Sequence, residues 1–313
     1  MTTRARLILN PSSGSEAALA HLDTINRALR ARHGVMEVVV TLGAGDCEEA
    51  ARVAVADGCG LLFVAGGDGT LNEALNGVAS AGALDAVTFG VVPLGTGNDF
   101  AAALGIPPEL DDALDVLLEE REIRTDLGEV NGRLFANVSG GGYIADVSEA
   151  VTPAMKTIAG RLAYLLGGAE ALLDFEPVRM TAAAEPGGER FGTALYAFAA
   201  CNSRLIGGGR LIAPHASIDD GLLDLCVIDA MPTLDFVALL RRVASGAHVE
   251  DPRVRYLQVE RVAMEFSRRI RLNTDGELLE AASCEYRVRP GAARFLAGGR
   301  TFTGNAGTGS TPA

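Results

Sequence analysis

The feature that most constrains the fold is a regular alternation over the first part of the chain, from Arg4 to about Arg121. Short apolar runs typical of buried strands alternate there with stretches of helical periodicity, as in "RLILN" followed by residues 17–32. Such an alternation predicts parallel strands joined by helices that cover both faces of one sheet. In the first helix, Leu19, Leu22, Ile25 and Leu29 should form one apolar stripe facing the sheet.

The loops that follow the predicted strands are the first candidates for a binding site. They read "NPSSG" at 10–14, "TLGAGD" at 41–46, "GGDGT" at 66–70 and "PLGTGND" at 93–99. Because parallel strands end at one edge of a sheet, these loops should gather there, where open α/β sheets bind ligands. Glycine lets a ligand approach the backbone, and N–H groups at a helix N-terminus attract anions. We therefore expect a phosphate chain at "GGDGT".

Asp68 is the acid in that loop, and at close range it would repel phosphate oxygens unless a divalent cation lay between them. The sequence therefore predicts a nucleotide with a bound metal ion. A simpler reading is that glycine after a strand only makes a tight turn, and Asn72 and Glu73 fit exposed helix positions equally well. Thr96 and Asn98 are better candidates, because "GTG" precedes another helix at the same edge.

The pattern changes after about Thr125. Alternating strands are now separated by hairpin signals such as Asn131-Gly132 and Pro186-Gly187-Gly188, which predict an antiparallel β domain. Two helical stretches interrupt it, at 153–173 and 233–244. We thus predict an α/β domain over residues 1–125, a β domain over 126–300, and a disordered tail over 301–313, which is rich in Gly, Thr and Ser.

Composition excludes several classes of protein. The formal net charge of -13 argues against a general nucleic-acid binder, and Lys156 is the single lysine, so a phosphate-binding lysine of the Walker type is absent. The histidines lack the spacing of zinc ligands. No run approaches the ~18–20 apolar residues that span a bilayer, and we expect a cytoplasmic protein. The scattered cysteines fit small buried residues in a reducing compartment: Cys47, Cys59, Cys201, Cys226 and Cys284.

Five motifs follow one another along the chain: "NPSSG" at 10–14, "GGDGTLNEALNG" at 66–77, "PLGTGNDFA" at 93–101, "APHASIDDGLLDL" at 213–225 and "NTDGE" at 273–277. Together they resemble the diacylglycerol kinase catalytic-domain family, in particular its bacterial lipid kinases, which are related to sphingosine and ceramide kinases. "GGDGT" alone also resembles the loops of NAD kinases and phosphofructokinases. The resemblance implies an ATP-binding α/β domain, a lipid-binding β-sandwich domain, and an active site in the cleft between them.

The resemblance also implies roles for individual residues. Asp275 would be the general base on the acceptor hydroxyl, and Asp68 and Glu277 complete the catalytic set. Asp275-Gly276 and "SIDDGL" are also ordinary turn sequences, and a role for Asp126 in the metal and water network is left open. A structural Mg²⁺ would be held by Ser217, Asp220 and Leu222, the first and last through backbone carbonyls. ATP would contact Asn10, Pro11, Ser12, Ser13, Gly14, Thr41, Gly66, Gly67, Asp68, Gly69, Thr70, Asn72, Glu73, Thr96 and Asn98.

The sequence departs from several relatives in its basic residues. Ser15 follows the first loop, where those relatives carry lysine, and the stretch 153–173 has only Lys156 and Arg161 as cations. Each missing basic residue costs about 1 kcal/mol of attraction to anionic lipid. An apolar face in that stretch suits either contact with a membrane surface or packing within the domain; it consists of Ile158, Leu162, Leu165 and Leu166.

Three functions are weighed. The leading hypothesis is an ATP- and Mg²⁺-dependent lipid kinase that transfers the γ-phosphate to a lipid hydroxyl such as that of diacylglycerol, giving phosphatidic acid. The alternatives are an enzyme similar to NAD kinase, for which no "NxGxLGF"-like strand is found, and a catalytically silent regulator that binds nucleotide or lipid. The expected partners are a lipid alcohol and, transiently, a membrane surface. A homodimer is compatible with the sequence, and no nucleic acid is expected.

Overall fold

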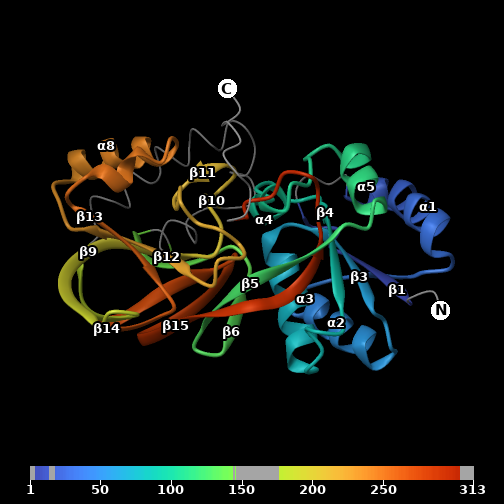
Figure 1. The fold of residues 1–313 in the computed structure, drawn as a ribbon, viewed down its shortest axis with the longest axis horizontal. Helices are drawn as coiled ribbons and strands as arrows, with labels where there is room; N and C mark the ends of the chain where they lie inside the picture. Colours follow the sequence, from blue (N-terminus) through green and yellow to red (C-terminus); the bar gives the residue numbers. More distant parts are fainter. Residues whose placement is uncertain (1–3, 14–17, 144, 146–175, 304–313) are drawn as a thin grey trace. The chain divides into compact units, whose positions relative to one another are not determined.

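The computed structural model describes residues 4–13, 18–143, 145 and 176–303, and the chain divides into two compact units (Figure 1). The first break, after Leu127, lies two residues from the predicted boundary. Two later segments also group with the first unit, which a division into consecutive domains does not foresee. Unit 1 comprises Met1–Leu127, Ser217–Gly221 and Arg289–Ala313, and unit 2 comprises Gly128–Ala216 and Leu222–Val288.

Unit 1 is built on a parallel sheet, as the alternating pattern predicts. Its strand order is β4-β3-β1-β2, and the end of β15 pairs in parallel with β4 through Arg294 and Phe295. Every residue of β1, β3 and β4 is buried, because helices cover both faces. The strands are β1 (Ala5–Leu9), β2 (Glu37–Val40), β3 (Leu61–Gly66) and β4 (Thr88–Pro93).

The helices of unit 1 lie in two groups. Figure 1 shows α1 and α5 on one side of the strands and α2 and α3 on the other. Ile25 and Leu29 of α1 are buried as predicted, but Leu19 is 53% exposed because it lies in a short 3-10 helix before α1 begins. The helices are η1 (Ala18–His21), α1 (Leu22–His33), α2 (Asp46–Ala56), α3 (Asp68–Ser80), α4 (Asp99–Ala103) and α5 (Leu110–Leu118).

Unit 2 is antiparallel, again as predicted. Its strand order is β13-β12-β9-β7-β14-β15, and the long strands β9 and β14 each pair with β7 along one part and with β8 along another. Strands β5 and β15 contribute residues to both units. The strands are β5 (Glu122–Val130), β6 (Arg133–Phe135), β7 (Val138–Gly142), β8 (Val178–Glu185), β9 (Glu189–Cys201), β10 (Leu205–Ile206), β11 (Arg210–Leu211), β12 (Leu223–Asp229), β13 (Val254–Val259), β14 (Arg261–Thr274) and β15 (Glu277–Leu296).

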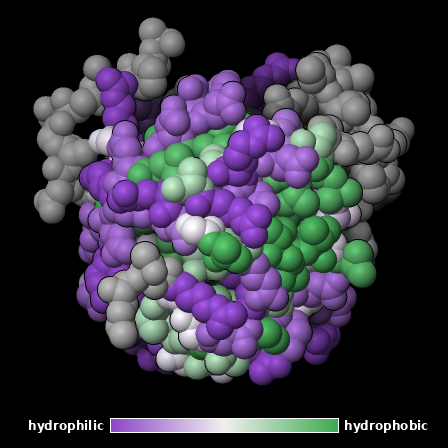
Figure 2. Space-filling view, turned by 90° about the vertical axis from the view of Figure 1, so that its right-hand side faces the viewer, coloured by the Kyte–Doolittle hydropathy of each residue, from purple (hydrophilic) through white to green (hydrophobic). Residues whose placement is uncertain are grey.

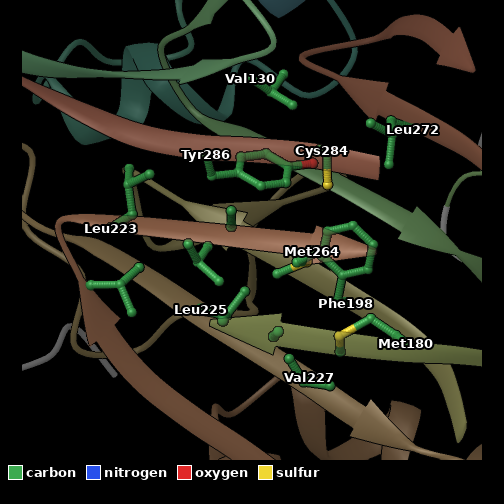
Figure 3. Packing of buried hydrophobic residues seen from close by; sticks show 14 of the residues in the cluster. Val130, Met180, Phe198, Leu223, Leu225, Val227, Met264, Leu272, Cys284 and Tyr286 are labelled. Carbon is green, nitrogen blue, oxygen red and sulfur yellow. The ribbon is translucent and has the colours of Figure 1, made fainter. Parts of the chain in front are cut away.

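Two apolar clusters form the core of unit 2. One is enclosed by the strands, and Figure 3 shows Phe198, Leu225 and Met264 packed within it, with Tyr286 close by. The other packs the opposite face of β9 and β12 against helix α8 (Thr233–Val243), with Phe236 at its centre. A short 3-10 helix, η3 (Ala247–Glu250), follows α8 in the chain. Side chains that alternate between two buried faces explain why β9 and β12 read as nearly continuous apolar runs.

The helices and exposed apolar residues of the described part of the chain bear on contact with membranes. None of their helices is both long enough and apolar enough to cross a bilayer. Val35 and Leu42 are 90% and 92% exposed, and Figure 2 shows apolar groups among the hydrophilic ones on the face that it views. Single exposed apolar residues are usual on folded proteins. The predicted helical stretch with Lys156, Ile158 and its neighbours, together with Gly14 and Ser15, lies outside the described residues.

All five cysteines are buried and unpaired by disulfides, which confirms their interpretation as small core residues. The predicted tail differs from expectation at its start, because Phe302 is bonded to unit 1. Its N–H donates to the Ala103 carbonyl at 2.9 Å, and its carbonyl accepts the Ile218 N–H at 2.9 Å. Residues 304–313 lie outside the described part of the chain.

Candidate functional site

The carboxyl ends of the unit 1 strands bring the predicted loops together. The Asn10 N–H donates to the Ala65 carbonyl at 2.9 Å, the Thr41 N–H to Leu9 at 3.0 Å, and the Leu94 N–H to Gly66 at 3.0 Å. Neighbouring parallel strands are thus locked together where their loops begin. The gathering of these loops at one edge confirms the expectation drawn from the strand order.

Thr70 joins the first of these loops to the third. Its Oγ1 accepts a hydrogen bond from Asn10 Nδ2 at 3.0 Å and lies 3.2 Å from Ser13 Oγ. Asn10 Oδ1 in turn accepts the Ser12 N–H at 2.9 Å, which shapes the turn through Pro11 and Ser12. Helix α3 begins at Asp68 after Gly67. The N–H groups of its first turn have no acceptor within the helix, so they can bind an anion.

The glycines of this edge are required because other protein atoms pack closely against their Cα atoms. A Cβ on Gly95 would lie 2.5 Å from the Gly67 Cα, and a Cβ on Gly66 would lie 2.6 Å from the Thr70 Cβ. Asn98 closes the second glycine loop in the left-handed conformation, with φ of 55°. Its Oδ1 accepts the Gly95 N–H and its Nδ2 donates to the Gly95 carbonyl, both at 2.8 Å. Thr96 is exposed at the tip of that loop.

Asp68 links two of the loops through its carboxylate. Oδ2 accepts the Asp99 N–H at 3.2 Å and Oδ1 accepts the Phe100 N–H at 3.1 Å, so Asp68 satisfies donors at the start of α4. Burial, with the Asp99 carboxylate nearby, raises the pKa of Asp68 to about 6. The side chain therefore changes charge close to neutral pH, and a divalent cation beside it would favour the ionised form.

Asn72 and Glu73 lie further along α3, where the structure shows contacts within the protein. Asn72 is fully buried, and Asn76 Nδ2 donates to its backbone carbonyl at 2.9 Å and to its Oδ1 at 3.1 Å. Glu73 Oε2 accepts the Cys47 N–H at 3.1 Å, at the start of α2. These bonds hold helices in place, and a nucleotide contact from either residue stays a prediction.

The predicted metal loop is fixed by Asp126. Its carboxylate accepts the N–H groups of Gly221 at 2.6 Å and Gly291 at 2.7 Å, while its own N–H donates to the Ile218 carbonyl at 2.7 Å. Burial, and to a smaller extent the charge of Asp219, raises the pKa of Asp126. Sequence reasoning left the role of Asp126 open, and the structure gives it a clear one in holding this loop.

The residues of that loop fit a hard cation. Ser217 Oγ donates a hydrogen bond to Asp219 Oδ1 at 2.8 Å. The Ser217 oxygen expected to bind a metal is therefore its backbone carbonyl. The Asp220 carboxylate is exposed. One carboxylate with backbone carbonyls is an oxygen set of the kind Mg²⁺ accepts, with water completing its shell. Within the described ranges no three His, Cys, Asp or Glu side chains cluster as metal ligands, so carbonyls such as that of Leu222 would be needed.

Asp275 lies in the turn between β14 and β15 and is held more firmly than an ordinary turn residue. Its carboxylate accepts the N–H groups of Ala136 at 2.7 Å, Asn137 at 3.2 Å and Val138 at 2.8 Å. Its own N–H donates to the Val138 carbonyl at 2.9 Å, and Asn273 Oδ1 accepts the Gly276 N–H at 2.9 Å. Together these bonds stabilise the φ of 48° at Asp275, which an aspartate rarely adopts.

This arrangement fixes the orientation of the Asp275 carboxylate. The residue is 6% exposed, and the N–H donors stabilise the ionised carboxylate in one position. A positioned carboxylate of this kind can take a proton from an alcohol.

Glu277 has a partner that the sequence did not reveal. Arg133 Nε and Nη2 donate to its two oxygens at 2.9 Å and 2.6 Å, and both side chains are partly buried. Because this fork occupies both oxygens, the geometry suits a residue that steadies the turn around Asp275. Its catalytic role stays a prediction. The two residues are 144 positions apart, and no spacing rule could have linked them.

Comparisons with known proteins match both units. A family model described as diacylglycerol kinase catalytic domain matches residues 4–130, and one described as YegS C-terminal NAD kinase beta sandwich-like domain matches 136–297. A diacylglycerol kinase of Bacillus subtilis is 35% identical over 275 residues, covering 88% of this chain and 89% of its own. One from Staphylococcus carnosus is 31% identical over 277 residues, with 88% and 89% covered.

Solved structures share the fold. A crystal structure of a diacylglycerol kinase from Bacillus anthracis aligns with a TM-score of 0.72 at 21% identity, covering 95% of this chain and 97% of that one. Another protein from the same bacterium gives a TM-score of 0.81 at 24% identity, with 95% of each chain covered. An α/β domain followed by a sandwich-like β domain is therefore the architecture of this chain.

Proposed function

Because this chain belongs to the diacylglycerol kinase family, we propose that it is an ATP- and Mg²⁺-dependent lipid kinase acting on a lipid alcohol such as diacylglycerol. The observation that carries the proposal is the Asp275 carboxylate, held by three backbone N–H groups on a turn within the "NTDGE" motif. Phosphorylation of an alcohol needs a group that accepts the hydroxyl proton, and a positioned carboxylate can do this.

ATP would bind at the glycine-lined edge of unit 1. The first-turn N–H groups of α3 would meet its phosphates, and Gly66, Gly67 and Gly95 let the loops around this turn pack closely because they lack side chains. Asn10 and Ser13 hold Thr70 at the rim of this site. Thr41 and Thr96 would contact the nucleotide from the neighbouring loops.

Mg²⁺ would serve two places. When bound with ATP it supplies positive charge that neutralises the phosphates, and Asp68 is the acid placed to favour it there. A structural Mg²⁺ would be held by Ser217, Asp220 and Leu222, where Asp126 already fixes the loop through the Gly221 N–H. Both assignments rest on the oxygen-rich chemistry of the residues present.

The proposed reaction transfers the γ-phosphoryl group of ATP to the acceptor hydroxyl. The acceptor hydroxyl oxygen forms a bond to the γ-phosphorus while the bond from that phosphorus to the bridging oxygen of ADP breaks, and the hydroxyl proton passes to Asp275. With diacylglycerol the product is phosphatidic acid. Asp275 would thus accept the proton of the same hydroxyl that receives the terminal phosphate. Arg133 and Glu277 steady the turn that carries Asp275.

The site of action follows from this substrate class. A lipid alcohol resides in a membrane, so a cytoplasmic enzyme would make transient contact with the membrane surface to reach it. Electrostatic attraction to anionic lipid should be weak, since the chain carries a net charge of -13. We further propose that sedimentation of the protein with vesicles will be weak and will rise with their content of diacylglycerol.

A radiometric assay tests the proposal. The purified chain is incubated with [γ-³²P]ATP, Mg²⁺ and separate acceptors: diacylglycerol, ceramide, a sphingoid base and NAD. We expect label in a lipid product that disappears when EDTA removes the metal. Label on NAD alone would contradict the lipid assignment in favour of a NAD kinase, and label on no acceptor would favour a regulator that binds without catalysis.

A further inference from the structure

Two buried polar atoms next to Asp275 have no hydrogen-bond partner among the described residues. They are Asn137 Oδ1 and Ser203 Oγ, and the residues that carry them are 3% and 0% exposed. A buried polar atom that is left unpaired costs about 1–3 kcal/mol. Native proteins rarely retain such atoms unless water or a ligand satisfies them.

Asn137 joins the surroundings of Asp275 through its other polar groups. Its N–H donates to the Asp275 carboxylate at 3.2 Å, and its carbonyl accepts the N–H groups of Asn202 at 2.9 Å and Ser203 at 3.2 Å. Its Nδ2 donates to the Leu205 carbonyl at 3.0 Å, where β10 begins. The remaining oxygen, Oδ1, therefore belongs to a residue whose backbone N–H is bonded to Asp275.

Ser203 is brought to the same place by its backbone. Because its N–H binds the carbonyl of Asn137, whose own N–H binds Asp275, only the peptide groups of Asn137 separate Ser203 from the carboxylate. A serine hydroxyl offers one donor and two acceptor lone pairs, whereas Asn137 Oδ1 only accepts. Together they match a group that both donates and accepts, and an alcohol is such a group.

We propose that Asn137 and Ser203 form a subsite for the acceptor hydroxyl beside Asp275; this inference rests on the proposed function. The Ser203 hydroxyl donates to a lone pair of the acceptor oxygen. The acceptor O–H donates to Asn137 Oδ1 before the reaction and to Asp275 as its proton is transferred. Asn137 and Ser203 end the reaction unchanged, while the acceptor oxygen gains the phosphorus and Asp275 gains the proton.

The competing explanation is a buried water molecule that bridges the two atoms for purely structural reasons. The two explanations predict opposite effects for Ser203→Ala. Ser203 Oγ makes no hydrogen bond to a described residue, so its loss frees the protein of an unsatisfied group. A structural water would give a change in stability alone. A substrate subsite would give a change in kinetics toward the acceptor with stability unchanged or raised.

The experiment measures Ser203→Ala with dioctanoylglycerol and ATP, together with the thermal midpoint of unfolding. We expect kcat/KM for dioctanoylglycerol to fall about three- to tenfold, the factor that one hydrogen bond supplies. The KM for ATP should stay unchanged, and the Tm should stay unchanged or rise. Binding of dioctanoylglycerol without ATP, measured by calorimetry, should weaken by a similar factor.

Ser139→Ala is the matched control. Ser139 is also a fully buried serine, two residues from Asn137, but its Oγ is bonded to Thr274 Oγ1 at 2.8 Å and to Tyr286 OH at 3.0 Å. Its replacement should lower the Tm because two buried partners lose a hydrogen bond. Assayed well below that Tm, it should leave the KM for dioctanoylglycerol unchanged.

Asn137→Asp provides an independent readout. It keeps an oxygen at the Oδ1 position and adds negative charge beside Asp275, which makes the ionised form of Asp275 less favourable. The acid limb of the kcat/KM profile should therefore move to higher pH. An unmoved limb would mean that residue 137 does not face the reacting group.

The outcomes separate the two proposals. If the wild-type protein phosphorylates no lipid alcohol, the proposed function fails whatever the variants do. If the wild type is active and Ser203→Ala retains its kinetics and its affinity for dioctanoylglycerol, the subsite is wrong and the function stands. A loss of activity that follows a loss of Tm in Ser203→Ala would assign Ser203 to the structure alone.

Discussion

The first turn of α3 in unit 1 and the Asp275 turn in unit 2 use backbone N–H groups in opposite ways. In unit 1 the first turn of α3 presents N–H groups that have no acceptor within the helix, so an external anion can bind there. In unit 2 the N–H groups of residues 136–138 are already bound to the Asp275 carboxylate. The donors of α3 are available to an external anion, whereas those of residues 136–138 fix a side chain.

Replacing the fixed carboxylate should have the largest effect. Asp275→Asn removes the proton acceptor and should lower kcat by about 10²- to 10⁴-fold. It should also destabilise the protein by about 1–3 kcal/mol, because the amide NH₂ cannot accept the backbone N–H groups that the carboxylate binds. Radiometric assays below the unfolding transition and urea denaturation measure the two effects. ATP affinity serves as the control and should be retained, and wild-type turnover would remove Asp275 from the mechanism.

Glycine substitutions test whether close packing of the unit 1 loops matters for nucleotide affinity. Gly95→Ala places a Cβ 2.5 Å from the Gly67 Cα, and the backbone must shift to admit it. We expect the KM for ATP to rise about tenfold or more, since overpacking of this kind costs about 1–3 kcal/mol. Gly67→Ala is the matched variant, because its nearest contact is 3.3 Å and needs only a small adjustment. Equal effects of the two variants would show that close packing of these loops does not set nucleotide affinity.

A pH titration of stability should reveal the raised pKa of Asp68. The pKa of Asp68 in the folded protein is raised to about 6 from a usual value of 3.8, so between those pH values the folded state binds more protons than the unfolded one. The contribution of Asp68 therefore makes the protein less stable as pH rises from about 4 to about 6. Urea denaturation in EDTA should show wild type gaining stability relative to Asp68→Asn as the pH falls. An unchanged difference between them would mean that Asp68 is not desolvated.

The smallest effect is expected at Glu277. Glu277→Gln weakens the partly buried fork with Arg133 and should cost up to about 1 kcal/mol of stability. If Glu277 only steadies the turn, kcat should fall no more than about threefold, which corresponds to well under 1 kcal/mol. A double-mutant cycle with Arg133→Gln isolates the coupling between the two side chains. A loss of kcat as large as that of Asp275→Asn would instead establish Glu277 as catalytic.

The sequence predicted the meeting of the unit 1 loops better than the side-chain partners found in unit 2. Parallel strands deliver their loops to one edge by geometry, so Asn10 and Thr70 meet although 60 positions separate them. In unit 2 the partners depend on how long antiparallel strands fold around a core. Nothing local in the chain indicates that Glu277 meets Arg133, and within unit 1 the same holds for the bond from the Gly291 N–H to Asp126. Periodicity also misled at Leu19, because it does not show where a helix begins.

The burial of the cysteines makes the chain convenient for spectroscopy. Desolvation raises the pKa of Cys226 and Cys284 to about 12 and that of Cys59 and Cys201 above its usual range, so little thiolate forms at neutral pH. Maleimides and spin labels should therefore leave the native protein unmodified. A cysteine introduced at Leu42 or Leu278, which are 92% and 46% exposed, would carry the label alone. One such dye could report nucleotide arrival near Thr41 and another the approach of lipid near Asp275, each in an otherwise silent background.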